Sequence, residues 1–180
     1  MTAAADRLHV VTGAPGTGKS TLIAALAEAG VATADEVGRQ ILREQVAVGG
    51  TALPWADAAA FGALMLPADI AAREAALAAG RPVVLDRGLP DIPAFFTVSG
   101  LAVPPACDVA ARDLRYNPRV FLAPFWPAIF VSDAERPLPP SHYAASEAVI
   151  VAAYRHYGYT PVVLPLASVA ERVRFVIERI

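Results

Sequence analysis

The sequence predicts an α/β fold: a five-stranded parallel β-sheet with helices on both faces. Three observations point to it. Short apolar runs alternate with stretches of helical periodicity. A glycine-rich turn follows the first apolar run, and 56% of the residues are hydrophobic against 18% charged, too apolar a balance for a disordered chain. The 180 residues suit one domain, so we take residues 1–180 as a single unit.

Five apolar runs are expected to form the sheet. The first precedes the glycine-rich turn, the third is the clearest buried strand and is followed by Asp86, and the fifth is entered through Pro161. The expected strands are 8–12, 31–33, 82–85, 120–123 and 162–164. Because parallel strands need long crossover connections, helices are expected between them.

The helices are placed by periodicity and by residues that begin or end a helix. Glycines at 30, 49 and 80 are expected to stop three of them, since glycine readily takes the left-handed conformation after the last turn. Pro67 is a point where the third helix could break. Ser168 and Glu171 have the spacing of a capping box. The expected helices are 19–29, 35–48, 55–79 and 141–157, with one beginning near Ile92 and one opened by Ser168.

The glycine-rich turn from Gly13 to Ser20 matches the phosphate-binding pattern G-x-x-x-x-G-K-[ST] in full. Glycines let the backbone curl so that main-chain N–H groups face phosphate oxygens, and the following helix directs its positive end at the same anion. Lys19, the only lysine of the chain, would reach the β- and γ-phosphates while the Ser20 hydroxyl binds Mg²⁺. The alternative is an ordinary glycine-rich turn with an exposed lysine. The residues expected to bind ATP or GTP are Gly13, Ala14, Pro15, Gly16, Thr17, Gly18, Lys19, Ser20 and Thr21.

Asp86 is the expected partner of the Mg²⁺ ion, because a P-loop needs a carboxylate at the end of a neighbouring strand. Burial there would be costly unless a metal or an arginine paired with it. Arg87 follows directly and could be that partner or a ligand of the substrate phosphates. The alternative is that Asp86 merely starts a turn before Gly88. Asp91 is expected to cap the helix that begins near Ile92.

The segment Asp86-Arg87-Gly88-Leu89-Pro90-Asp91 carries a family resemblance. With the P-loop, it resembles the small AAA-type predicted ATPases and kinases of the P-loop kinase superfamily marked by Asp-Arg-Gly-x-Pro-Asp. More distantly, the chain is similar to nicotinamide riboside kinase and deoxynucleoside kinases. The resemblance implies a P-loop NTPase fold of nucleoside and nucleotide kinase type, an acidic residue after the second strand that touches the acceptor hydroxyl, and lid arginines that clasp the phosphates. It continues through Glu36, Arg39, 54–55, Phe61, 115–116, 120–121, 124–126, Asp133, 135–136, Tyr154, 158–159 and 164–165.

The Pro-rich segment 124–140 is the candidate lid. It combines an apolar stretch with Asp133, Glu135 and Arg136. Members of the group often carry paired arginines after the acidic residue, whereas here Pro137 follows. Arg136 alone is therefore expected to stabilise charge on the transferring phosphoryl group. The apolar side chains of this segment either pack on the sheet or meet a protein partner.

On the acceptor side, Glu36 is the expected catalytic base, because the second strand should deliver it beside the phosphates. Its alternative is an ordinary carboxylate at a helix start. Arg39, one turn later, could hold Glu36 or a substrate anion, or form a surface pair. Trp55 is a candidate for lining the acceptor pocket together with Phe61, although aromatic residues at such spacing are more often core.

These parts predict an ATP-dependent kinase that uses Mg²⁺ and phosphorylates a small hydroxylated, nucleoside-like metabolite. The alternative is a regulatory ATP- or GTP-binding module, or an NTPase, acting through a protein partner. With a formal net charge of −2, the protein has no overall positive electrostatic field to attract the phosphates of nucleic acid, so no nucleic-acid partner is expected. The longest apolar stretch is too short to span a bilayer, and we expect a cytoplasmic protein. A homo-oligomer is left open.

Overall fold

The structure is a computed structural model that describes residues 4–129 and 140–180. One sheet of five parallel strands runs through it, in the order β2-β3-β1-β4-β5. The strands are β1 (Leu8–Thr12), β2 (Ala32–Ala34), β3 (Val83–Asp86), β4 (Arg119–Leu122) and β5 (Thr160–Val163). The predicted five-stranded parallel α/β sheet is confirmed.

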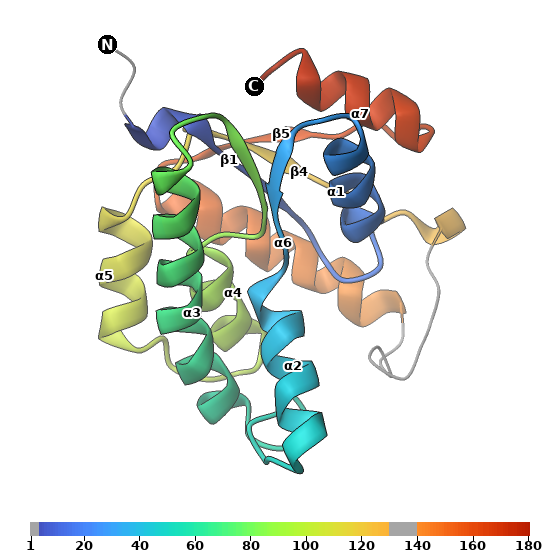
Figure 1. Cartoon of the computed structure of the whole chain (residues 1–180). Coiled ribbons are helices and arrows are strands. Elements are labelled where there is room, and N and C mark those ends of the chain that lie inside the picture. The colour runs from blue at the N-terminus through green and yellow to red at the C-terminus, as the bar shows by residue number, and fades with distance from the viewer. Residues whose placement is uncertain (1–3, 130–139) are drawn as a thin grey trace.

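Helices cover both faces of the sheet (Figure 1). The helices α1 and α7 pack against each other on one face, while α4 packs against α3, α5 and α6 on the other, where α2 packs against α3. The helices are α1 (Lys19–Glu28), α2 (Val37–Val48), α3 (Ala58–Ala78), α4 (Asp91–Val98), α5 (Pro105–Asp113), α6 (Pro140–His156) and α7 (Val169–Ile177), with 3-10 turns η1 (Ala4–Arg7) and η2 (Pro127–Ile129).

The strand sequences explain why both faces are covered. Successive side chains of a strand point to opposite faces, and in β1 Val10 belongs to the core under α3 to α6 whereas Val11 belongs to the core under α1 and α7. Val84 and Leu85 of β3 divide in the same way. A strand that is apolar at every position therefore needs a helical layer on each side.

Two helical features differ from the sequence-based expectation. The α3 helix runs unbroken through Pro67, because a proline removes only one backbone donor and the buried face of this 21-residue helix packs against its neighbours. The α5 helix was not predicted at all. Its signal was Pro105, which stands in the first turn, where proline is well tolerated.

The strand order places β1 between β3 and β4. After β1 the chain forms β2 and β3 on one side of this strand, and it then forms β4 and β5 on the other side. In open parallel sheets ligands bind at such a switch point, beyond the carboxyl ends of the strands. In the part of the chain that the structure describes, no helix is long and apolar enough to cross a membrane.

Candidate nucleotide site

The turn from Gly13 to Gly18 leaves the carboxyl end of β1 and enters α1. Gly13 has φ 138°, and a Cβ there would lie 2.3 Å from the Ala123 carbonyl oxygen, so no other residue fits without moving the backbone. Gly18 has φ 79° and is the N-cap of α1. Leu22 N donates back to Gly18 O at 3.1 Å. The N–H groups of residues 19–21 lie in the first turn of α1, where backbone N–H groups have no acceptor within the helix.

Lys19 lies inside the loop in this structure. Its Nζ donates to the carbonyl oxygens of Gly13 and Ala14, both at 2.8 Å, and the residue is 5% exposed. Burial, together with the positive charge of Arg87, lowers the pKa of Lys19 to about 8. An ammonium group that loses its hydration in this way gains from a nearby polyanion. Ser20 and Thr21 are exposed in the first turn of α1.

Asp86 ends β3 beside β1, where its backbone pairs with Val11. The side chain is buried, and its Oδ1 has no hydrogen-bond partner among the described residues. Burial raises the pKa of Asp86 to about 6 against the opposing charge of Lys19. A buried, unpartnered carboxylate oxygen suits a cation. Mg²⁺ is commonly held by one or two carboxylates together with substrate phosphates, so Asp86 and the Ser20 hydroxyl fit that ion.

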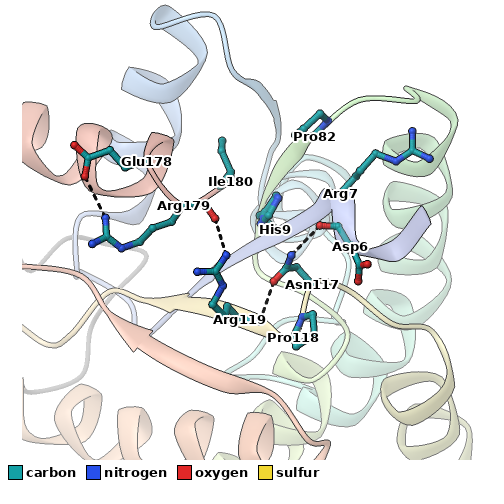
Figure 2. Close-up of a pocket in the computed structure, with 10 residues that line it drawn as sticks. All are labelled: Asp6, Arg7, His9, Pro82, Asn117, Pro118, Arg119, Glu178, Arg179 and Ile180. Atoms are coloured by element: carbon teal, nitrogen blue, oxygen red, sulfur yellow. Dashed lines mark hydrogen bonds and ion pairs between the residues drawn. The ribbon is translucent and has the colours of Figure 1, made fainter. Parts of the chain in front are cut away.

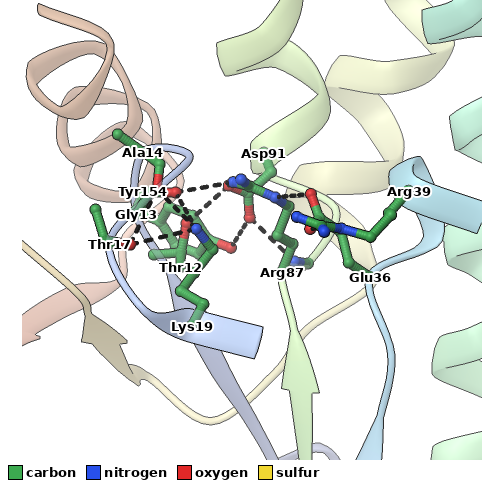
Figure 3. A network of polar contacts seen from close by, with 11 residues as sticks. Thr12, Gly13, Ala14, Thr17, Lys19, Glu36, Arg39, Arg87, Asp91 and Tyr154 are labelled. Carbon is green, nitrogen blue, oxygen red and sulfur yellow. Dashed lines mark hydrogen bonds and ion pairs between the residues drawn. The ribbon is translucent and has the colours of Figure 1, made fainter. Parts of the chain in front are cut away.

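Arg87 connects three parts of the site (Figure 3). Its Nε donates to Glu36 Oε1 at 2.7 Å, and its Nη1 donates at 3.1 Å to both the Gly13 carbonyl oxygen and Asp91 Oδ1. The backbone takes φ 76°, a left-handed conformation that is unfavourable for arginine. The two carboxylates raise the pKa of Arg87 although burial opposes them. Among the described residues Arg87 forms its ion pairs with Glu36 and Asp91 and none with Asp86, although its positive charge opposes the rise in the pKa of Asp86.

Asp91 is a buried acceptor and not a helix cap. It lies inside the first turn of α4, and Pro90 is the N-cap. Its Oδ1 accepts from Thr12 Oγ1 at 2.7 Å, and its Oδ2 accepts from Tyr154 Oη at 2.6 Å and from Gly88 N at 3.0 Å (Figure 3). With Arg87, these donors fill the lone pairs of the carboxylate. Asp91 therefore ties β1, α6 and the 87–91 turn together.

Glu36 precedes α2 and points toward Arg87 (Figure 3). It stands at the N-cap position but makes no capping hydrogen bond with its side chain, which goes against the ordinary helix-start interpretation. Arg39 Nε lies 3.5 Å from Glu36 Oε2. Burial alone would raise the pKa of Glu36, but Arg87 and Lys19 lower it to about 2. The carboxylate is thus ionised and held in place.

The remaining predicted site residues lie elsewhere. Trp55 is 57% exposed and stands in the connection between α2 and α3. The core role favoured for Trp55 is wrong, whereas Phe61 is buried as expected. In the candidate lid, 124–129 are described, but Asp133, Glu135 and Arg136 lie outside the described residues.

Asp69 is a buried carboxyl that sequence reasoning missed. It lies on the face of α3 that carries Met65 and Arg73, and it is 8% exposed. Burial, together with the negative charge of Asp91, raises the pKa of Asp69 to about 7. The signal was present in the sequence, since Met65, Asp69 and Arg73 share one helix face at four-residue spacing.

Asp69→Asn is expected to stabilise the protein increasingly as the pH rises from about 4 to about 7. The folded pKa of Asp69, about 7, lies above the ordinary 3.8. The folded state therefore keeps a proton that the unfolded state releases, and stability falls through this window. Asparagine carries no such proton, so the gain should reach about 2–4 kcal/mol above pH 7. Urea unfolding at each pH measures it. Asp113→Asn, at an exposed position of α5, is the control, and a pH-independent difference for Asp69→Asn would contradict the prediction.

A hollow of about 690 Å³ lies at the opposite edge of the sheet (Figure 2). It is lined by residues at the amino ends of β1, β3 and β4 and at the end of the chain, among them His9, Pro82, Asn117 and Arg179. None of the predicted site residues lines it. The convergence of buried charge at the carboxyl edge, and not this hollow, marks the candidate site.

Comparisons with known proteins agree with this fold. A family model described as AAA domain matches residues 8–172. Shikimate kinase from Acinetobacter baumannii, solved in complex with shikimate, has a similar structure with a TM-score of 0.56 and 16% sequence identity. The similarity covers 95% of this chain and 90% of that one. At this identity the likeness establishes the fold alone. A search of curated proteins finds no match to the sequence.

Proposed function

The chain belongs to the AAA domain family, and from that premise we propose that it is a P-loop kinase. It would bind ATP, or GTP, with Mg²⁺ on the segment from Gly13 to Thr21 and transfer the γ-phosphoryl group to a hydroxyl of a small, nucleoside-like metabolite. The observation that carries the proposal is a buried carboxylate oxygen of Asp86 that has no hydrogen-bond partner within residues 4–129 and 140–180, beside a buried Lys19.

The donor side of the reaction uses groups of the loop. The amides of the first turn of α1 and the Lys19 ammonium would bind the β- and γ-phosphates. Bound Mg²⁺, held by Ser20 and Asp86, would neutralise charge on the phosphates. Because phosphoryl transfer is mostly positioning and charge neutralisation, these few groups are sufficient on this side.

The acceptor side uses Glu36. Its carboxylate stays ionised because Arg87 and Arg39 surround it, so it can accept a hydrogen bond from the attacking hydroxyl. The hydroxyl oxygen bonds to the γ-phosphorus while the bond to the β,γ-bridging oxygen breaks. A carboxylate with a pKa of about 2 is a weak base. We therefore propose that Glu36 orients the hydroxyl and that the hydroxyl proton leaves late, to an oxygen of the transferred phosphoryl group, as a loose transition state permits.

The decisive experiment is a screen of a metabolite library for ADP release with Mg²⁺-ATP, with mass spectrometry of the products. Glu36→Gln is expected to lower transfer to the acceptor by about 10²- to 10³-fold, because it removes the charge that orients the hydroxyl. It should leave ATP affinity nearly unchanged, since the Glu36 carboxylate pairs with Arg87 and Arg39.

The matched control is Glu44→Gln, at an exposed position of the same helix. It should transfer phosphate like the wild type. If no metabolite is phosphorylated and Glu36→Gln leaves a slow ATP hydrolysis unaltered, the kinase proposal fails and a nucleotide-dependent regulatory module takes its place.

A further inference from the structure

Arg172 is a buried cation of α7 that has no role in the phosphoryl transfer proposed above. It is 3% exposed, and its Nη1 donates to the Thr17 carbonyl oxygen at 3.1 Å. Its Nε and Nη2 are buried and have no hydrogen-bond partner in the described part of the chain. Unlike Arg87, it pairs with no carboxylate among those residues.

Such an arrangement is costly to the folded protein. Burial lowers the pKa of Arg172, as expected for a guanidinium that has lost its hydration. Buried donors without partners each cost free energy, and a buried charge costs more. An apolar side chain of similar length would fill the same space without that cost. Packing alone therefore does not account for an arginine here.

The contact with Thr17 gives Arg172 a direct link to the phosphate loop. The Thr17 side chain is itself held, since its Oγ1 donates to the Ala14 carbonyl oxygen at 2.9 Å. The Thr17–Gly18 peptide is trans, so its N–H points opposite to its C=O. When Arg172 holds the Thr17 carbonyl from the α7 side, the Gly18 N–H is directed away from α7.

The space around Gly18 is closed on the α7 side. A Cβ at Gly18 would lie 3.1 Å from Arg172 Nη1 and 3.1 Å from Ile129 Cδ1. A side chain at position 18 would therefore press on Arg172 and Ile129. Gly18 also holds the left-handed N-cap conformation from which α1 starts. Arg172 thus acts on the peptide that directly precedes the N-cap of α1.

We propose that Arg172 is a positioning residue for the nucleotide: it holds the Thr17–Gly18 peptide so that the Gly18 N–H faces the phosphates of a nucleoside di- or triphosphate. Those phosphates in turn bring negative charge close to a guanidinium that pairs with no carboxylate among the described residues. The inference rests on the proposed nucleotide binding but not on phosphoryl transfer, and it names a residue 155 positions from Thr17 in the sequence.

The test compares Arg172→Met, Arg172→Lys and the control Arg174→Met, which removes a cation at an exposed position of the same helix. Isothermal titration with ADP and Mg²⁺ gives the affinity, and urea unfolding without nucleotide gives the stability. Arg172→Met should weaken ADP binding about 10- to 100-fold, the effect of losing a charge-assisted hydrogen bond. Its unfolding midpoint should be unchanged or higher. Arg172→Lys should recover part of the affinity, and Arg174→Met should bind like the wild type.

A third readout follows the peptide itself. In ¹⁵N-glycine-labelled protein, ADP should shift the assigned Gly18 amide proton strongly in the wild type and weakly in Arg172→Met. A merely structural arginine would instead lower stability and leave this shift in place.

The outcomes separate the two proposals. Wild-type affinity in Arg172→Met, or a Gly18 shift equal to that of the wild type, overturns the role of Arg172 while nucleotide binding stands. If the methionine variant does not fold, Arg172→Lys decides: a weakened Gly18 shift supports the role, and an unchanged one overturns it. A wild-type protein that binds neither ADP nor ATP overturns both proposals.

Discussion

Lys19→Met is expected to weaken ATP binding about 100-fold and to lower phosphoryl transfer about 10³-fold, the range found when a preorganised charged group is removed from a transition state. Lys19 Nζ is hydrogen-bonded to the carbonyls of Gly13 and Ala14, so the ammonium already lies within the loop that receives the phosphates. Methionine has a similar length and no charge, so the change removes attraction to the polyanion more than packing. Calorimetric titration with Mg²⁺-ATP measures the first effect.

Arg43→Met is the control for this variant, because Arg43 lies at an exposed position of α2. It removes one positive charge away from the loop and should leave ATP binding as it was. Unfolding curves should show that Lys19→Met is folded. Retained ATP affinity in a folded Lys19→Met protein would contradict the nucleotide site itself.

Arg87→Met is expected to lower the free energy of unfolding by about 3–5 kcal/mol, the cost of breaking a buried ion pair by removing one partner. It removes the cation shared by the carboxylates of Glu36 and Asp91, whose side chains are 17% and 4% exposed, and leaves Glu36 paired with Arg39. It also removes one of the two donors to the Gly13 carbonyl oxygen, the other being Lys19 Nζ. Urea unfolding at neutral pH measures the loss.

The destabilisation of Arg87→Met should shrink as the pH falls from 5 toward 2. In the wild type the folded pKa of Glu36, about 2, lies below the ordinary 4.5. Its stabilising contribution is therefore present above 4.5 and lost as the pH falls through 2, and the variant has less of it to lose. Arg112→Met, which breaks an exposed pair with Asp108 on α5, should change stability by about 0.5 kcal/mol or less. An equally small change in Arg87→Met would show that this cluster does not stabilise the fold.

The sequence predicted those parts of the site whose geometry is set by residues close together in the chain. The P-loop could be located because glycine, lysine and serine at fixed spacing set the backbone and its charges within eight positions. Asp86 could be located because an apolar strand of a parallel sheet delivers its last residue to the carboxyl edge. The capping box of Ser168 and Glu171 is present as predicted.

Contacts between distant residues were not predictable in this way. Arg87 was expected to serve Asp86 or a phosphate, but it bonds Glu36, 51 residues away. Asp91 was expected to cap a helix, but it accepts from Thr12 and Tyr154, at separations of 79 and 63 residues. A carboxylate can satisfy its lone pairs with any donor that the fold brings near, and a single sequence does not tell which donor that is.

The sequence by itself determined the parallel α/β sheet, the phosphate loop and the carboxylate at the end of β3, because periodicity, glycine conformation and strand direction act over a few residues. Only the tertiary structure decided how the buried charges are shared: Glu36 and Asp91 pair with Arg87, Asp69 lies within the field of Asp91, and Arg172 donates to a loop carbonyl. The physical reason is that the energy of a buried charge depends on what surrounds it in space. That surrounding is assembled from strands and helices far apart along the chain.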